Sequence, residues 1–423
     1  GPRPEVLGAQ VPAPPAAGTV DSPPTREARM AGPLDGTRIV ETCSMITGPL
    51  ATMILADQGA EVIKVEPPGL GDVMRHLTTS REGISALFAN CNRSKRSVAI
   101  DIRTGRGREL LETLVAGAQV FVQNYRPGVV ERLGLDEPSL RRLRPDLVYV
   151  SISAFGPKGP WAHRPAYDHV IQATAGWAAV QGDPESGRPG FVKSAIMDKV
   201  TAYTAAQAIT AALLARERSG VGQHLQLSML DAGIAFLWPD GMANHTYLEP
   251  DTVLQAAVSD YYRMVETSDG FLAVAAATDA QFHGLFRAFD RPELGEDPRF
   301  ASYAGRAQHF HELMAAIGLS HPEFTSVELL ARLEAEDVPC APVLALGEIP
   351  EQPQVQENGI LEVREHPRAG RMRQPRPPVR FAATPIGSRG FAPALGGDTE
   401  AVLAGLGLDV GEIARLREAG VVA

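Results

Sequence analysis

Cysteine is scarce in this 423-residue chain, and its placement excludes the structures that cysteine usually builds. Cys43, Cys91 and Cys340 are odd in number and lie far apart, so a framework of structural disulfides is excluded. No CxxC pair and no Cys/His spacing typical of zinc occurs, and we therefore expect no metal site. This use of cysteine fits a reducing compartment, so we expect a cytoplasmic protein.

Long hydrophobic runs and an excess of basic charge are missing as well. The best candidate for a membrane span, AITAALLA at 208–215, is too short to cross a bilayer and is followed by RER. The formal net charge of −10 argues against general binding to nucleic acid or to a membrane surface, because both need basic surface. A local basic patch can still bind a small anionic molecule.

The first residues lack the features of a signal peptide. Residues 1–29 are rich in Pro, Ala and Gly and contain no apolar central region. The chain starts with Gly-Pro, as a cleaved tag would leave it, and Met30 is an alternative start. We therefore expect residues 1–30 to form a disordered extension outside the fold.

From residue 34 onward, short strands rich in β-branched residues alternate with helices. Strands are expected at 37–44, 61–68, 96–102, 119–125, 146–153 and 224–230, and helices at 48–60, 106–118 and 199–218. The strands are apolar throughout rather than alternating, which is typical of a parallel sheet covered on both faces. The pattern therefore predicts an α/β fold, with its first part at 31–224.

The composition changes after about residue 245. Residues 261–277 read as a hairpin with Asp269 and Gly270 at its turn, and short helices follow, which predicts a linker and a small α+β domain at 225–335. From Pro339 to Pro385 the chain is rich in Pro and Arg and reads as a long wrapping segment. Two helices close the chain, so 336–423 is expected to return to the large domain and complete it.

Three common ligand-binding turns are absent. The first strand-to-helix turn reads CSMITGPLAT and lacks the G-x-G-x-x-G of dinucleotide-binding domains. No G-x-x-x-x-G-K-[ST] occurs, which excludes a P-loop, and no G-x-S-x-G elbow occurs, which argues against an ordinary hydrolase.

Two basic loops are present in this acidic chain. One, at 92–108, surrounds an expected strand, and the other, at 123–134, comes just after another. Their basic residues are Arg93, Lys95, Arg96, Arg103, Arg106, Arg108, Arg126 and Arg132. Ligands of open α/β sheets bind at the carboxyl ends of strands, so these loops either bind a phosphorylated ligand or form a solvated charged face. Tyr125 is equally open, because it can fill the core or provide a platform for a planar base.

One acid, Asp198, opens the alanine-rich helix expected at 199–218. Its carboxylate can cap the free N–H groups of the first turn. Alternatively, the positive end of the helix can hold it as a carboxylate for chemistry. The helix by itself favours the cap, because caps are common and catalytic acids are rare.

Nine segments, in order and at characteristic spacing, identify the chain as similar to the family III CoA-transferases. This group includes formyl-CoA and carnitine CoA-transferases and the related α-methylacyl-CoA racemases. The resemblance runs from residue 32 to about 422 and is carried by GPLDGTRIVE, ITGPLATMILADQGAEVIKVEPPGLGD, NRSKRSVAID, QNYRPGVVERLGL, RPDLVYVSISAFGPKGP, RPAYDHVIQATAG, MDKVTAYTAAQAITAALLARERSGVGQ, VPCAPVLALGEI and PPVRFAATP.

The resemblance implies a Rossmann-like large domain, a smaller second domain and two chains interlocked as a homodimer. It places the nucleophilic aspartate of the family on Asp198, 25 residues before Gln223. It also implies acyl-CoA and a small carboxylic acid as substrates, with no permanently bound cofactor. The CoA contacts of the family fall on Met45, Ile46, Thr47, Ile100 to Arg103, Asn124, Tyr125, Arg126 and Arg132.

Departures from the family pattern leave alternatives. No glycine-rich run occurs at 240–280, which argues against oxalate and formate as substrates. The racemases pair an aspartate with a histidine, but Tyr167 takes the place of that histidine; Tyr167 and Asp168 are expected to contact substrate or support the site. We interpret the nearby His169 as structural or surface-exposed. A racemase or epimerase and a non-catalytic CoA-binding homologue therefore remain as alternatives to the transferase.

Overall fold

A six-stranded sheet forms the centre of the computed structural model, which describes residues 32–183 and 186–423. All its strand pairs are parallel. The strands are β1 (Arg38–Glu41), β2 (Glu61–Glu66), β5 (Lys95–Ala99), β6 (Val120–Gln123), β7 (Val148–Ser153) and β8 (His224–Ser228). All six were expected, at nearly these positions. The predicted extension at 1–30 lies outside the described residues.

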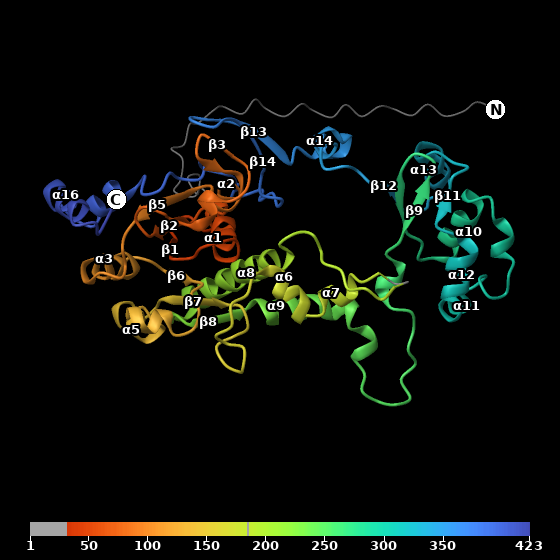
Figure 1. The fold of residues 1–423 in the computed structure, drawn as a ribbon, viewed down its shortest axis with the longest axis horizontal. Helices are drawn as coiled ribbons and strands as arrows, with labels where there is room; N and C mark the ends of the chain where they lie inside the picture. Colours follow the sequence, from red (N-terminus) through yellow and green to blue (C-terminus); the bar gives the residue numbers. More distant parts are fainter. Residues whose placement is uncertain (1–31, 184–185) are drawn as a thin grey trace, which may run out of the picture.

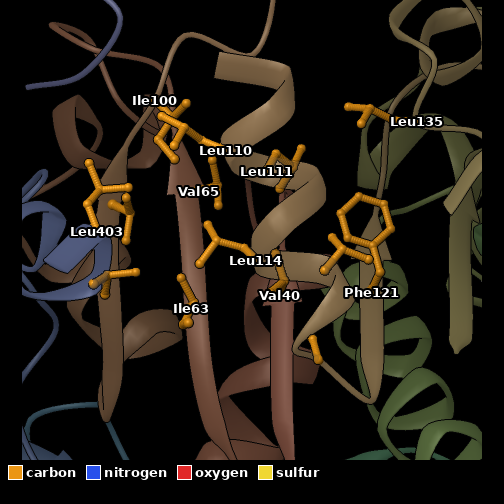
Figure 2. Packing of buried hydrophobic residues seen from close by; sticks show 14 of the residues in the cluster. Val40, Ile63, Val65, Ile100, Leu110, Leu111, Leu114, Phe121, Leu135 and Leu403 are labelled. Carbon is orange, nitrogen blue, oxygen red and sulfur yellow. The ribbon is translucent and has the colours of Figure 1, made fainter. Parts of the chain in front are cut away.

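Both faces of this sheet are buried, because neighbouring residues of each strand point to opposite faces. Ile39 and Val62 belong to one hydrophobic cluster, and the adjacent Val40 and Ile63 belong to the other. Figure 2 shows the second cluster, in which leucines of a helix lie against the sheet. Continuous apolar strands are therefore explained by packing on two sides.

Helices cover each face. On one face lie α1 (Thr47–Asp57) and α8 (Ile196–Ser219), and the small residues Ala202, Ala205 and Ala206 let α8 pack closely. The other face carries α3 (Gly105–Ala116), α5 (Glu137–Leu143), α15 (Thr399–Gly405) and α16 (Val410–Glu418). The chain thus returns at its end to complete the core of the large sheet.

The strand order identifies where a ligand should bind. The sheet runs β5-β2-β1-β6-β7-β8, so counting only its own strands gives the order 3-2-1-4-5-6 of Rossmann-like folds. The order reverses between β1 and β6. In such sheets the ligand crevice lies beyond the carboxyl ends of the two strands at this switch point.

A second, mixed sheet of four strands has its own core. Its strands are β9 (Met264–Thr267), β10 (Phe271–Val274), β11 (Ser320–His321) and β12 (Cys340–Pro342). The expected hairpin is β9 and β10, paired antiparallel. Around it pack α10 (Asp279–Ala288), α12 (Phe310–Ile317) and α13 (Ser326–Ala335), while α11 (Tyr303–Gln308) precedes α12. The core includes Phe286 and Leu329 and draws only on residues 265–340.

The Pro- and Arg-rich segment contains more secondary structure than its sequence indicated. It includes α14 (Pro353–Asn358) and a hairpin of β13 (Leu361–His366) and β14 (Gly370–Pro375). The hairpin lies along α2 (Ala86–Asn92): Gln374 donates to the carbonyl of Ala89 at 3.1 Å, and Arg93 donates to that of Pro375 at 2.7 Å. Alternation of charged residues, as in LEVREH, had concealed the hairpin.

Figure 1 shows how the parts are arranged. The four-stranded sheet and its helices stand apart from the six-stranded sheet, and the chain crosses between them once before β9 and once after β12. The predicted domain boundaries stay a prediction.

Among the described helices, α8 included, none is both long and apolar enough to cross a membrane. The remaining α-helices of the described residues are α4 (Val129–Leu133), α6 (Asp168–Thr174), α7 (Trp177–Val180) and α9 (Met229–Gly241).

Candidate active site

Two loops meet at the switch point of the sheet. One follows β1 and leads into α1, and the other follows β6. Asn124 joins them, because its side-chain oxygen accepts from the backbone N–H of Ser44 at 3.0 Å and its amide donates to the Ser44 carbonyl at 2.8 Å. This paired hydrogen bond holds the two loops at the position where Rossmann-like folds bind their ligand.

The turn after β1 does without the glycine-rich sequence of a dinucleotide site. Met45 adopts a left-handed backbone conformation with φ of 65°, which is uncommon for a residue with a side chain. Gly48 is required where α1 begins, because a Cβ at this position would lie 2.4 Å from the Sγ of Cys43. The turn is therefore tight, and it brings the first residues of α1 close above β1.

Asp198 lies in the first turn of α8, but it does not cap that helix. The residue before α8 is Ala195, which offers no side-chain cap. The carboxylate that accepts the backbone N–H of Asp198, at 3.0 Å, comes from Asp168. The capping interpretation of Asp198 is wrong: Asp168 satisfies the helix N–H, and the Asp198 carboxylate remains available for another role.

The side chain of Asp198 points toward α1. Its Oδ1 accepts a hydrogen bond from the hydroxyl of Thr47, the first residue of α1. The carboxylate thus lies near the beginnings of two helices, α1 and α8, where unpaired backbone N–H groups favour a negative charge. Neither strand nor helix periodicity could have indicated this contact, which joins residues 151 positions apart.

The surroundings of Asp198 raise its pKa to about 6, from 3.8 for an ordinary aspartate. Burial has the largest effect, since it disfavours the charged form, and the nearby Asp168 carboxylate acts in the same direction. Hydrogen bonds from Thr47 and the charge of Lys199 lower the pKa. Asp198 is consequently ionised at neutral pH and is more basic, hence more nucleophilic, than a carboxylate in water.

A cavity of about 240 Å³ opens in front of Asp198. It brings together seven of the residues expected from the sequence: Met45, Thr47, Asn124, Tyr125, Arg126, Tyr167 and Asp198. Tyr125 also packs against the hydrophobic cluster on the sheet, and its role as a platform for a planar base stays a prediction. Asp168 is buried beneath the cavity, where it also accepts from Gln172 at 2.6 Å.

Other expected contacts lie away from this cavity. Ile46 packs beside a small core of Met74, Phe88 and Cys91. Ile100 is 1% exposed and pairs with Val422, so its side chain belongs to the core. Arg103 is exposed and forms an ion pair with Asp101 at 2.8 Å. Arg132 is exposed on α4. As CoA contacts, these residues stay predictions.

The residues that matter for the racemase alternative can also be placed. Tyr167 precedes α6, lines the cavity and is 63% exposed. His169 is exposed, and its ring lies 6.4 Å from that of Phe191 rather than among the residues lining the cavity. The observed surroundings of His169 agree with the interpretation of this residue as structural or surface-exposed.

Sequence reasoning missed one basic residue of the cavity. Arg164 lines the same wall as Tyr167, and its guanidinium lies 4.5 Å from the ring centre of Trp161. The indole in turn packs edge-on against Phe155 at 5.4 Å. Arg164 had a signal, since it belongs to the RPAYD stretch, but it follows no strand and was therefore not counted with the basic loops.

The fold and the site together define a class: a Rossmann-like α/β protein with a carboxylate of raised pKa at its switch point and arginines beside it. Comparison with known proteins specifies this class further. The model of CoA-transferase family III matches residues 34–399. The succinyl-CoA:glutarate CoA-transferase of Mus musculus is 32% identical over 92% of this chain and 90% of its own length.

Two further relatives agree. The succinate–glutarate CoA-transferase of Agrobacterium fabrum is 34% identical over 88% of this chain and 96% of its own length. The crystal structure of a CAIB/BAIF family protein from Brucella suis superposes with a TM-score of 0.75 and 32% identity, covering 89% of this chain and all of that one. The chain belongs to CoA-transferase family III and is an enzyme that moves CoA between an acyl-CoA and a carboxylate.

Proposed function

We propose that Asp198 is the covalent nucleophile of this CoA-transferase. One observation carries the proposal: the carboxylate faces the cavity at the switch point, is held by Thr47, and is freed from helix capping by Asp168. A nucleophile must be ionised, accessible and oriented, and Asp198 meets all three conditions at neutral pH.

The reaction then proceeds through two covalent intermediates, an acyl-enzyme anhydride and an enzyme-CoA thioester. The Asp198 carboxylate attacks the thioester carbonyl, the C–S bond breaks, and an aspartyl–acyl anhydride and CoA thiolate result. The thiolate attacks the aspartyl carbonyl, which releases the first acid as its carboxylate and leaves an aspartyl-CoA thioester. An incoming carboxylate repeats these steps in reverse, so that CoA leaves on the second acid and Asp198 is regenerated. No net proton is consumed.

The cavity suits the reacting end of the substrate. Its volume, about 240 Å³, is below the roughly 300 Å³ at which pockets for whole drug-sized ligands begin. It therefore receives the thioester and a short acyl group, while the nucleotide end of CoA extends toward the basic loops after β5 and β6. Exclusion of bulk water from a small cavity also protects the anhydride from hydrolysis.

For the acids, short dicarboxylates are the first candidates. Two similar proteins carry names that pair succinyl-CoA or succinate with glutarate. A dicarboxylate needs a cation for its second carboxylate, and both Arg126 and Arg164 line the cavity. We expect a mass-spectrometric screen of acyl-CoAs against free acids to give the highest turnover with dicarboxylic acids of this length.

Trapping with hydroxylamine tests the covalent mechanism. The enzyme is incubated with the most active acyl-CoA of the screen and hydroxylamine, and the peptide containing Asp198 is examined by mass spectrometry. Hydroxylamine cleaves the activated aspartyl carbonyl and leaves a hydroxamate on Asp198, whereas the Asp198→Asn variant should stay unlabelled. An unlabelled wild-type enzyme that exchanges the α-proton of acyl-CoA in D₂O would instead support a racemase, and absence of both reactions would support a non-catalytic homologue.

A further inference from the structure

Four charged side chains are buried beneath the turn that carries Met45 and Thr47. They are Glu41 on β1, Lys64 on β2, Lys95 on β5 and Asp72 in the loop after β2, and each side chain is at most 1% exposed. Two are cations and two are anions, so the group, called the tetrad below, is neutral as a whole. Burying four charges is costly unless each charge has partners, so the partners of these side chains indicate what the tetrad does.

The ion pairs of the tetrad form a connected chain. Lys64 Nζ lies 2.9 Å from Asp72 and 3.7 Å from Glu41. Lys95 Nζ lies 2.7 Å from the same Glu41 oxygen. Burial by itself would neutralise the Lys64 ammonium, but Glu41 and Asp72 outweigh it and raise the pKa of Lys64. The Lys64 ammonium therefore remains charged.

Besides bonds from Lys95 to Asn92 and from Met74 to Asp72, each tetrad side chain has a hydrogen bond to the turn after β1 or to the first residues of α1. Lys64 donates to the carbonyl of Cys43 at 2.7 Å, and Asp72 accepts from the N–H of Met45 at 3.2 Å. Lys95 donates to the carbonyl of Pro49 at 2.7 Å. Glu41 accepts from the hydroxyl of Thr52 at 2.7 Å. The four side chains thus hold the segment 43–52 at four points, on both sides of Thr47.

The hydrogen bond from Met45 to Asp72 shows that the tetrad affects the backbone conformation of the turn. The left-handed conformation of Met45 is unfavourable for a residue other than glycine, so it persists only where the surroundings enforce it. Asp72 does so, since Oδ1 also accepts from Met74 at 3.0 Å and the carboxylate is fixed by Lys64. Thr47 follows two residues later, and its hydroxyl meets Asp198.

We infer that the tetrad is a positioning device for the reaction: it holds the Met45–Thr47 turn so that Thr47 meets the Asp198 carboxylate. In this chain, charged side chains from the sheet and from the loop after β2 shape the turn that glycines shape in dinucleotide-binding domains. Asp72 and Lys64 act only through the turn and are positioning residues. The inference extends the proposed role of Asp198 and rests on it.

The test replaces the ion pair with apolar residues of similar size. Lys64→Met/Asp72→Leu leaves no unpaired buried charge, so the variant should fold. It nevertheless removes the hydrogen bonds from Lys64 to the Cys43 carbonyl and from the Met45 N–H to Asp72. We expect kcat to fall about 10- to 100-fold with the best substrate pair of the screen, because small displacements in an active site cost this much. The acid limb of kcat should move up by about one pH unit, since Thr47 no longer stabilises ionised Asp198.

The other charged groups near Asp198 are the same in the wild type and in the double variant, so they do not account for a difference between their pH profiles of kcat. Asp168 raises the pKa of Asp198 and Lys199 lowers it, and Arg126 and Arg164 line the same cavity. None of these residues contacts the tetrad in the observed hydrogen bonds or ion pairs. Combining Thr47→Val with the double variant should give no further shift, because both changes remove the same hydrogen bond.

Asp57→Asn is the matched control. Asp57 is buried on α1 and pairs with Arg93 at 2.6 Å, but its partners fix the hairpin segment at Pro375 rather than the turn. The control should lower the melting temperature and keep the wild-type acid limb. An acid limb that shifts equally in both variants, or in neither, would overturn the positioning role.

A crystal structure of Lys64→Met/Asp72→Leu separates this inference from the nucleophile proposal. We expect Met45 to leave its left-handed conformation and the hydrogen bond from Thr47 to Asp198 to be broken. An unchanged turn would refute the role of the tetrad even if Asp198 is the nucleophile. A displaced turn would support it even if the hydroxylamine experiment failed, in which case only the covalent mechanism would be lost.

Discussion

The carboxylate of Asp168 accepts a hydrogen bond from the backbone N–H of Asp198 at 3.0 Å. Two acids that are 30 positions apart thus divide two tasks at the start of one helix. Asp168 satisfies the helix N–H, and Asp198 turns its own carboxylate toward Thr47 and the cavity. Burial raises the pKa of Asp198 most, and the nearby Asp168 carboxylate raises it further.

Replacing Asp198 with Asn or Ala should abolish CoA transfer and leave CoA binding nearly unchanged. Loss of the nucleophile removes the covalent route, which positioning alone cannot replace. Because burial raises the pKa of Asp198, its charge destabilises the fold at neutral pH, so the melting temperature should not fall. Turnover assays, calorimetric CoA binding and thermal melts check these points. If the Asp198→Asn variant turns over at nearly the wild-type rate, and mass spectrometry shows that it has not deamidated to Asp, the mechanism is refuted.

The Thr47→Val variant should need a higher pH for activity. Wild-type kcat is expected to fall as the pH drops through about 6, where Asp198 takes up a proton. The Thr47 hydroxyl stabilises the ionised form, so its removal raises the pKa and moves the acid limb upward by about one unit. Thr47→Ser, which keeps the hydroxyl, is the control. A pH profile of kcat that is identical for Val and wild type would contradict this role.

The Asp168→Asn variant should show the opposite shift. An amide oxygen still accepts the N–H of Asp198, but the negative charge that raises the pKa of Asp198 is gone. The acid limb of kcat should therefore move downward, below about pH 6. The measurement is the pH profile of kcat alongside that of Thr47→Val. A shift in the same direction for both variants would show that one of them acts by distorting the site.

Among the basic residues, Arg126 should matter most for CoA binding. It lines the cavity directly, whereas Arg103 is already paired with Asp101 and Arg132 lies on α4. A charge-assisted contact contributes about 1–3 kcal/mol, so Arg126→Ala should weaken CoA binding roughly 5- to 100-fold. Alanine at Arg103 or Arg132 should have smaller effects within this range, and added salt should mimic them.

Calorimetric titration with CoA measures these affinities. Arg299→Ala is a matched control, because Arg299 is a partly exposed arginine paired with Asp297 and Glu312 beside the four-stranded sheet. If Arg103, Arg126 and Arg132 can all be replaced without loss of affinity, the basic loops are solvated surface only.

The protein should be an obligate, interlocked homodimer. Its four-stranded sheet stands apart from the six-stranded sheet (Figure 1). The segments that connect the two sheets expose large apolar side chains. Leu248 is 92% exposed and Leu346 is 86% exposed. Apolar surface of this kind indicates a partner, and a second copy threaded between the two sheets would cover it. Linked rings cannot separate without unfolding, so dilution should yield no folded monomer.

Mass photometry from micromolar to low nanomolar concentration measures the oligomeric state, and mixing of tagged with untagged protein measures exchange. A folded monomer on dilution, or exchange of subunits within minutes, would show that the chains are not interlocked.

Local pattern alone was enough for the elements of the large sheet. The strand VFVQ at 120–123, for example, has apolar residues on both faces, and a parallel sheet covered on both sides buries such a strand, so the strand could be predicted from its own residues. The hairpin at 361–375 could not be read in this way. Its strands are charged and half-exposed, and they form because Arg93 and Gln374 bind them to a surface distant in sequence.

The chemistry of the site depended on contacts that no local pattern records. Asp198 alone was ambiguous between cap and nucleophile, and only the N–H bond to Asp168 decided against the cap. The left-handed Met45 and the buried Lys64 and Asp72 look unremarkable in sequence, since charge patterns do not show burial. Hydrogen bonds and ion pairs act over about 3 Å, and such distances arise between residues far apart in the chain only after the sheet has formed.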